Sequence, residues 1–253
     1  MNLAIIQARY SSNRLPGKVL RELQGKPMLL QQIDRVKRAN NIDKLVVATS
    51  VEESDNPIAE LCETNNIEYF RGDLDDVLKR FYDCAAYYNA TNLVRLTGDC
   101  PLLDPKIIDD TVSLHIKEQS DYTSNCLRLS YPDGQDVEVF TFEALKDAHQ
   151  NAKKPSEREH VTPFIRNHKN YSKSNLMNGV DLSDYRMSVD HLVDFNFAEL
   201  VYNELYELNP NFSLNDIINL LKNKPEIKSV NQDIEYNEGY MKSLKEDQEK
   251  GFK

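Results

Sequence analysis

Short apolar runs alternate with segments of helical periodicity over the first half of this chain, and this alternation restricts the fold more than any other feature. The apolar runs lie at 3–6, 44–48, 67–70 and 92–97, and the helical segments at 27–39, 55–64, 73–88 and 105–118. Strands that alternate with helices form parallel βαβ units. We therefore predict an α/β fold with a doubly wound, mostly parallel sheet.

The rhythm changes after residue 120, where shorter strand candidates occur at 121–125, 136–140, 172–177 and 186–189. Helices are expected between them at 141–151 and 155–168, and closing helices at 194–208 and 213–221. We predict that residues 1–235 form one domain, with a small mixed α/β lobe within about 121–180. Residues 236–253 are charged and lack an apolar period, so we expect a solvated helix or a frayed tail.

The charge of the chain limits its partners. With 31 basic and 41 acidic residues, its formal net charge is −10, so it has no overall field to attract nucleic acid or an anionic membrane. No apolar run approaches the roughly 20 residues that cross a bilayer. The four cysteines contain no C-x-x-C pair, which favours reduced thiols. We expect a cytoplasmic protein with no nucleic-acid or membrane partner.

Three cations gather on the polar loop that follows the first strand. Arg9, Arg14 and Lys18 lie there with small polar residues and a Pro-Gly turn at 16–17. Ligands of open α/β sheets bind at the carboxyl ends of the strands. The loop therefore predicts an anion site, which a triphosphate would suit. The chain has no G-x-G-x-x-G or P-loop pattern, so a dinucleotide fold or a P-loop NTPase is not expected.

Two aspartates follow other predicted strands. Asp99 ends the 92–97 strand within the sequence TGDCP, and Asp190 ends the strand expected at 186–189. Carboxylates at strand ends can reach a Mg²⁺ ion that bridges nucleotide phosphates. Capping of the 105–118 helix is better assigned to Asp104, and Asp194 is interpreted as the cap of the last long helix rather than a ligand.

Further polar groups occur at two more places. Asp136 and Glu138 are two residues apart, so in a strand they share one face and can point into a cleft, where they would bind a cationic acceptor group or help to hold metal; a solvent-exposed hairpin edge is the alternative. His160, on a predicted helix, is by itself more often structural than catalytic. Arg95, inside an apolar strand, must find a partner if it is buried.

Several motifs resemble one known family. QARYSSNRLPGK at 7–18, DDVL at 75–78, DGQDVEVF at 133–140, EHVTP at 159–163 and VDHLVD at 189–194 are similar to segments of the cytidylyltransferases that activate acidic sugars. The most similar group within that family is the spore-coat polysaccharide group. The resemblance covers residues 1–205. His191-Leu192-Val193 departs from the common family form, in which Thr or Ser and Pro are frequent.

The resemblance implies the following roles. CTP would be bound by Ala8, Arg9, Ser11, Arg14, Lys18, Arg71 and Asp99; Mg²⁺ by Asp99 and Asp190; the acceptor by Asp136, Glu138, Arg158 and His160; and the catalytic groups would be Arg14, Lys18, Asp99 and Asp190. It also implies a nucleotide-diphospho-sugar transferase-like fold and a homodimer formed through the smaller lobe.

The activity implied is transfer of CMP from CTP to an acidic sugar, with release of pyrophosphate, in the synthesis of surface polysaccharide precursors. A phosphorylated alcohol, an amino acid or a phosphonate is an alternative acceptor. A sugar-nucleotide-dependent glycosyltransferase is another alternative, although 181–184 does not supply its D-x-D motif. A non-catalytic nucleotide-binding protein and a uridylyl- or guanylyltransferase also stay open.

Overall fold

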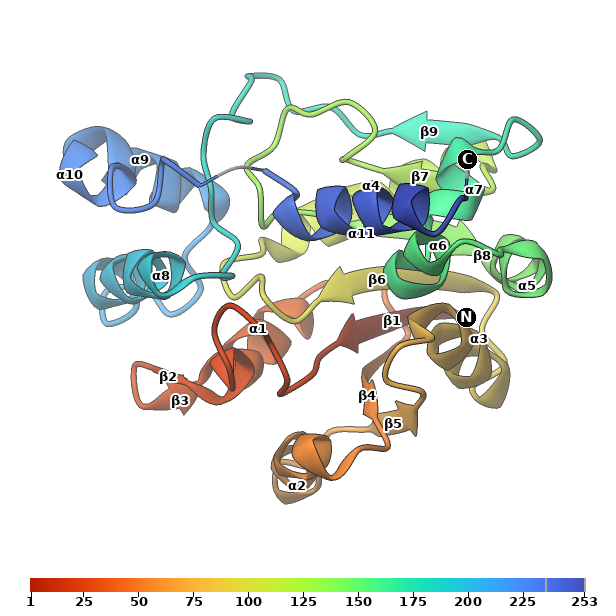
Figure 1. The fold of residues 1–253 in the computed structure, drawn as a ribbon. Helices are drawn as coiled ribbons and strands as arrows, with labels where there is room; N and C mark the ends of the chain where they lie inside the picture. Colours follow the sequence, from red (N-terminus) through yellow and green to blue (C-terminus); the bar gives the residue numbers. More distant parts are fainter. Residues whose placement is uncertain (235, 253) are drawn as a thin grey trace.

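A seven-stranded sheet forms the centre of the computed structural model, which describes residues 1–234 and 236–252 (Figure 1). The strand order is β5 (Tyr69–Gly72), β4 (Lys44–Ser50), β1 (Asn2–Gln7), β6 (Asn92–Thr97), β8 (Glu138–Thr141), β7 (Tyr122–Ser124) and β9 (Lys173–Asn175). The first four strands are parallel, β8 is antiparallel to both neighbours, and β9 is parallel to β7. The predicted mostly parallel α/β sheet is confirmed.

Helices cover both faces of the sheet. The helices are α1 (Met28–Val36), α2 (Asn56–Thr64), α3 (Val77–Tyr87), α4 (Pro105–Glu118), α5 (Phe142–Asn151), α6 (Pro155–His160), α7 (Pro163–Asn167), α8 (Leu192–Leu205), α9 (Leu214–Asn223), α10 (Pro225–Lys228) and α11 (Glu238–Glu249). A small hairpin, β2 (Glu22–Leu23) with β3 (Lys26–Pro27), and the 3₁₀ turns η1 (Lys18–Leu20) and η2 (Glu53–Asp55) complete the elements.

The central strand β1 contributes side chains to two hydrophobic cores, one on each face of the sheet, because successive side chains of a strand point to opposite faces. Ala4 and Ile6 belong to a cluster with apolar residues of α1, α2, α4, α8 and α9. Leu3 and Ile5 belong to a second cluster with α3 and α5. All four of these side chains are fully buried. A strand that is apolar on both faces is buried on both faces, which fixes β1 and the loop after it at the middle of the molecule.

The predicted helix cap Asp104 is confirmed, the role of Asp194 is modified, and Ser213 is a further cap. The Asp104 carboxylate accepts a hydrogen bond from Lys106 N at the start of α4, and Ser213 accepts one from Asp216 N at the start of α9. Asp194 lies inside the first turn of α8, where its carboxylate accepts a hydrogen bond from His191 N. It satisfies a free amide of the helix start from within the helix.

Two expectations about the second half of the chain are wrong, and a third is correct only in part. Residues 186–189 form no strand; they are extended, with an isolated bridge between Arg186 and Asp133, and their backbone bonds go to loops. The single helix expected at 155–168 is broken into α6 and α7, because Val161 has a φ of 69° and Pro163 follows. The C-terminal segment forms a helix, α11, which is one of the two alternatives expected, but this helix packs against α6 (Figure 1) and is therefore not wholly solvated.

Within the described residues, no helix is both long enough and apolar enough to cross a membrane.

Gly134→Ala is expected to lower the free energy of unfolding by about 2 kcal/mol or more. Gly134 has a φ of +90°, and a Cβ there would lie 2.4 Å from Ser188 N, a backbone atom that cannot rotate away. Gly179→Ala is the matched control, because a Cβ at that position meets nothing within 4 Å. Urea denaturation of both variants measures the difference, and equal stabilities would contradict this account.

Candidate active site

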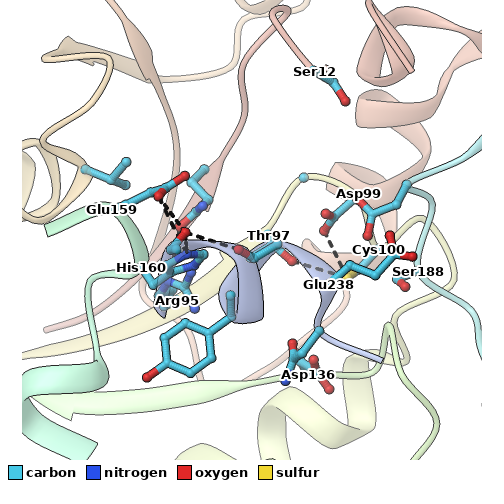
Figure 2. A pocket seen from close by; sticks show the side chains of 18 of the residues that line it. Ser12, Arg95, Thr97, Asp99, Cys100, Asp136, Glu159, His160, Ser188 and Glu238 are labelled. Atoms are coloured by element: carbon cyan, nitrogen blue, oxygen red, sulfur yellow. Dashed lines mark hydrogen bonds and ion pairs between the residues drawn. The ribbon is translucent and has the colours of Figure 1, made fainter. Parts of the chain in front are cut away.

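A pocket of about 710 Å³ opens at the carboxyl ends of β1 and β6. Its walls come from the loop after β1, the end of β6, the start of β8, the α6–α7 turn, residues 186–190 and α11. Figure 2 shows Asp99, Cys100 and Ser188 at one end of this pocket and Arg95, Glu159 and His160 at the other. This is the edge at which an α/β sheet binds its ligands.

The loop cations meet the two predicted aspartates at one end of the pocket. Lys18 Nζ lies 3.3 Å from Asp99 Oδ2 and 2.9 Å from Asp190 Oδ1, and it donates a hydrogen bond of 2.7 Å to Val189 O. Arg14 Nη2 lies 2.7 Å from Asp190 Oδ1. The convergence predicted for Arg14, Lys18, Asp99 and Asp190 is therefore confirmed. Ala8 and Arg9 also line the pocket.

Two glycines bring the loops of this cluster into contact. Gly17, with a φ of +68°, turns the loop just before Lys18, and left-handed backbone of this kind favours glycine. Gly98 precedes Asp99, and a Cβ there would lie 2.9 Å from Gln7 O. The loops after β1 and β6 can approach so closely only because this position has no side chain.

A second arginine, Arg186, contacts Asp190 together with two further aspartates, Asp133 and Asp194. Arg186 donates to the carboxylates of Asp133 and Asp194 at 2.6 and 2.9 Å, and its Nη2 lies 3.4 Å from Asp190 Oδ2. Asp194 is fully buried, so an arginine partner offsets much of the cost of burying its charge. The sequence reading missed this role of Arg186, because Asp133 is 53 positions away in the chain.

These contacts shift the protonation of the cluster. Burial alone would lower the pKa of Lys18, but the carboxylates of Asp99 and Asp190 outweigh that effect and raise it. Burial raises the pKa of Asp190, whereas Lys18 and Arg14 lower it by more, so the net shift is strongly downward. Lys18 is a cation and Asp190 an anion at neutral pH.

Three of the four predicted acceptor residues, Asp136, Glu138 and His160, line the pocket. The Glu138 carboxylate is fully engaged by Arg95, by Tyr122 Oη at 2.5 Å and by Thr162 Oγ1 at 2.6 Å. Glu138 is thus the partner that Arg95 needs, and its first role is structural.

Asp136 differs from Glu138 because it has no ion pair within the part of the chain that the structure describes. Burial raises its pKa to about 7, and the nearby carboxylate of Asp133 adds to the effect. Its pocket position agrees with the prediction that both acidic residues share one face.

Three predicted site residues lie outside the pocket lining. Ser11 is exposed. Arg71 donates hydrogen bonds to Ser50 O and Glu52 O, which ties β5 to the end of β4. Arg158 pairs with Asp76, the cap of α3, and with His149 O. Arg71 and Arg158 bind the protein's own polar groups. The structure therefore does not bring these three residues into the pocket, and their binding roles stay predictions.

Several pocket residues were not anticipated. Arg80 of α3 lines the pocket and is 2% exposed, and burial lowers its pKa to about 10. Arg166 of α7 and six residues of α11 also line it. The buried arginine of α3 could not be found from the sequence, because an arginine inside an amphipathic helix has no distinctive spacing. α11 could not be found from its hydrophobic pattern, because its buried face is polar.

An α/β sheet that gathers cations and carboxylates around one pocket at its strand ends defines a nucleotide-binding class of protein. A family model described as cytidylyltransferase matches residues 3–224, so the chain belongs to the cytidylyltransferase family. Like the other members, it is a CTP-dependent nucleotidyltransferase.

Three known proteins illustrate the similarity. The chain is 33% identical to the spore coat polysaccharide biosynthesis protein SpsF of Bacillus subtilis, over 88% of this chain and 95% of SpsF. It is 33% identical to the 3-deoxy-manno-octulosonate cytidylyltransferase of Geobacter metallireducens, over 46% of this chain and 45% of that protein. A solved cytidylyltransferase from Leptospira borgpetersenii superimposes with a TM-score of 0.87 at 32% identity, covering 93% of this chain and 99% of that chain.

The imidazole of His160 is expected to titrate well below its ordinary pKa of 6.5, near 4. Burial disfavours the charged ring, and Arg95 and Arg166 add repulsion against the attraction of Glu159. Between pH 6.5 and about 4, His160 binds a proton in the unfolded chain but not in the folded chain. The stability that the folded state has with neutral His160 is therefore fully present above pH 6.5 and is lost as the pH falls toward 4.

Histidine NMR of the folded protein measures the His160 midpoint, and urea denaturation between pH 7 and 5 compares wild type with His160→Gln. The variant should lose less stability over that interval. A midpoint near 6.5 would contradict the burial argument.

Proposed function

We propose that this enzyme transfers CMP from CTP to an acidic sugar and releases pyrophosphate, in the synthesis of surface polysaccharide precursors. The observation that carries the proposal is the cluster of Arg14, Lys18, Asp99 and Asp190 at one end of a pocket. The other end of the same pocket has room for an acceptor. The names of the relatives, a spore coat polysaccharide protein and a 3-deoxy-manno-octulosonate cytidylyltransferase, support a sugar acid as acceptor.

The donor set of the cluster fits a magnesium ion. Asp99 and Asp190 direct oxygens at one common cation, the Lys18 ammonium, so their carboxylates can also face a shared metal. The described residues contain no group of three or more His, Cys, Asp or Glu side chains placed to hold an ion. Mg²⁺ commonly takes one or two carboxylates and completes its shell with phosphates and water. When bound, it neutralises charge on the nucleotide phosphates.

The residues of the chain act on the transfer by position and charge. The acceptor hydroxyl gives up its proton to solvent as its oxygen forms a bond to the α-phosphorus of CTP, while the bond from that phosphorus to the bridging oxygen of pyrophosphate breaks. Arg14 and Lys18 stabilise the negative charge that develops on the leaving pyrophosphate. The walls of the pocket hold the acceptor oxygen in line with the α-phosphorus, which supplies much of the rate enhancement.

The family match argues against the sugar-nucleotide-dependent glycosyltransferase. Asp181 also argues against it: this carboxylate is used locally, where its Oδ1 accepts hydrogen bonds from the backbone and hydroxyl of Ser183.

Lys18→Ala and Asp99→Asn are each expected to lower turnover by at least about a hundredfold, because each removes charge stabilisation from the transition state. The assay is CTP-dependent pyrophosphate release with Mg²⁺ and a panel of acidic sugars that includes 3-deoxy-manno-octulosonate. Lys106→Ala, which removes an exposed i,i+4 ion pair outside the pocket, is the control and should keep full activity.

Thermal melting confirms that the variants are folded. Near wild-type rates in Lys18→Ala or Asp99→Asn would remove that residue from the mechanism. Equal turnover with UTP or GTP would contradict the choice of nucleotide.

A further inference from the structure

Helix α11 forms one wall of the pocket although it lies outside residues 3–224, the part of the chain that matches the family model. Its pocket-lining residues are Glu238, Gly239, Tyr240, Lys242, Ser243 and Glu246. Spacings of three and four place residues on one side of a helix. The helix therefore presents one continuous face to the pocket, while Met241 and Lys245 are exposed and lie outside the lining.

The helix is attached at both ends. Near its C-terminus the Asp247 carboxylate, 3% exposed, accepts hydrogen bonds from the backbone and hydroxyl of Ser156. At its N-terminus Glu238 Oε2 lies 2.9 Å from His191 Nε2 and 3.9 Å from Arg14 Nη1. α11 thus spans the pocket from the α6 side to the triphosphate-binding cations proposed above, and in Figure 1 it crosses the molecule beside α6.

Between these ends the helix contacts two polar groups of the acceptor half. Ser243 Oγ lies 2.9 Å from His160 Nε2. The ring of Tyr240 packs edge-on against the His160 ring, with centroids 5.1 Å apart, and the Arg166 guanidinium lies 5.1 Å from the centroid of Tyr240. Contacts of this kind fix the orientation of both side chains.

Arg166 is a cation of this half that makes no ion pair with a carboxylate among the described residues. Arg95 is paired with Glu138, and Arg186 with Asp133 and Asp194. Arg166 lines the pocket, and the described part of the chain gives it no ion pair. Its guanidinium can therefore receive an anionic group of the acceptor, either a carboxylate or a phosphate, in a geometry set by Tyr240.

We propose that α11 is the acceptor-selecting wall of this active site, and that Tyr240 is a positioning residue that orients Arg166 and His160 toward an anionic, hydroxyl-bearing acceptor. The inference rests on the proposed function, because it takes this half of the pocket as the acceptor half. The cations and carboxylates that act on CTP all lie within the family match. Acceptor choice can then differ between relatives through the residues of this wall, which lies outside the family match, without any change in the shared chemistry.

The test compares Tyr240→Ala, Tyr240→Phe and Ser243→Ala with Lys245→Ala, a control on the exposed side of the same helix. Calorimetry gives the Kd for CTP. Pyrophosphate release gives kcat and KM for 3-deoxy-manno-octulosonate and N-acetylneuraminate, which carry a carboxylate, and for glycerol 3-phosphate, which carries a phosphate. The acceptors that wild type turns over show whether the anionic group it recognises is a carboxylate or a phosphate.

Tyr240→Ala should raise the acceptor KM by about tenfold or more, the effect of losing a desolvated cation–π contact, and leave the Kd for CTP within about twofold. Tyr240→Phe keeps the ring and should restore most of the wild-type KM, and Lys245→Ala should match wild type. Ser243→Ala, which removes one hydroxyl, should raise the acceptor KM by about three- to tenfold and carries the test if Tyr240→Ala does not fold.

An unchanged acceptor KM in both Tyr240→Ala and Ser243→Ala, with wild type active, would overturn the role of α11. A parallel loss of CTP affinity would also overturn it, since it would indicate a general structural effect. Wild type that binds CTP but turns over none of the three acceptors would overturn the proposed acceptor class, and this inference with it. Wild type that does not bind CTP would overturn the proposed function itself.

Discussion

The Lys18 ammonium is the interaction on which the active site depends. It joins three segments that are far apart in the chain, because its partners Asp99 and Asp190 are 81 and 172 positions away. The ammonium is largely buried, so its charge must be paired. The same requirement holds each carboxylate in place. One cation therefore fixes the relative positions of the loop after β1, the end of β6 and the extended segment before α8.

The parts of the fold that follow from local pattern were predictable. β6 and α4 have the predicted bounds, since a strand buried on both faces reads as an apolar run and Asp104 with Pro105 starts a helix distinctly. Asp99 was predictable from its place after such a strand. Asp190 was assigned on the expectation of a strand at 186–189 that does not exist, and its position depends on backbone bonds from that segment to Asp99 O and Asp133 O.

The parts that were not predictable depend on contacts between distant segments. Arg158 and His160 lie on one short helix, yet the first turns to Asp76 and the second to the pocket. Helical spacing assigns residues to faces, but only packing decides which face meets the pocket. α11 is a stronger example, because its sequence pattern did not even indicate that the helix is packed against the protein. Its inner face is polar because it packs on hydrogen-bonding groups, so it lacks the apolar period that identifies a packed helix.

The charge balance of the pocket explains why its two ends behave differently. Arg14 and Lys18 are already paired with Asp190, so under the proposed function an incoming triphosphate must compete with this carboxylate for both cations. If Asp99 and Asp190 bound Mg²⁺ as proposed, that competition would be relieved, and the affinity for the nucleotide would be coupled to the affinity for the ion. In the proposed acceptor half Arg166 makes no ion pair among the described residues, so we expect selectivity there to depend on how the walls orient its guanidinium and not on displacement of an internal ion pair.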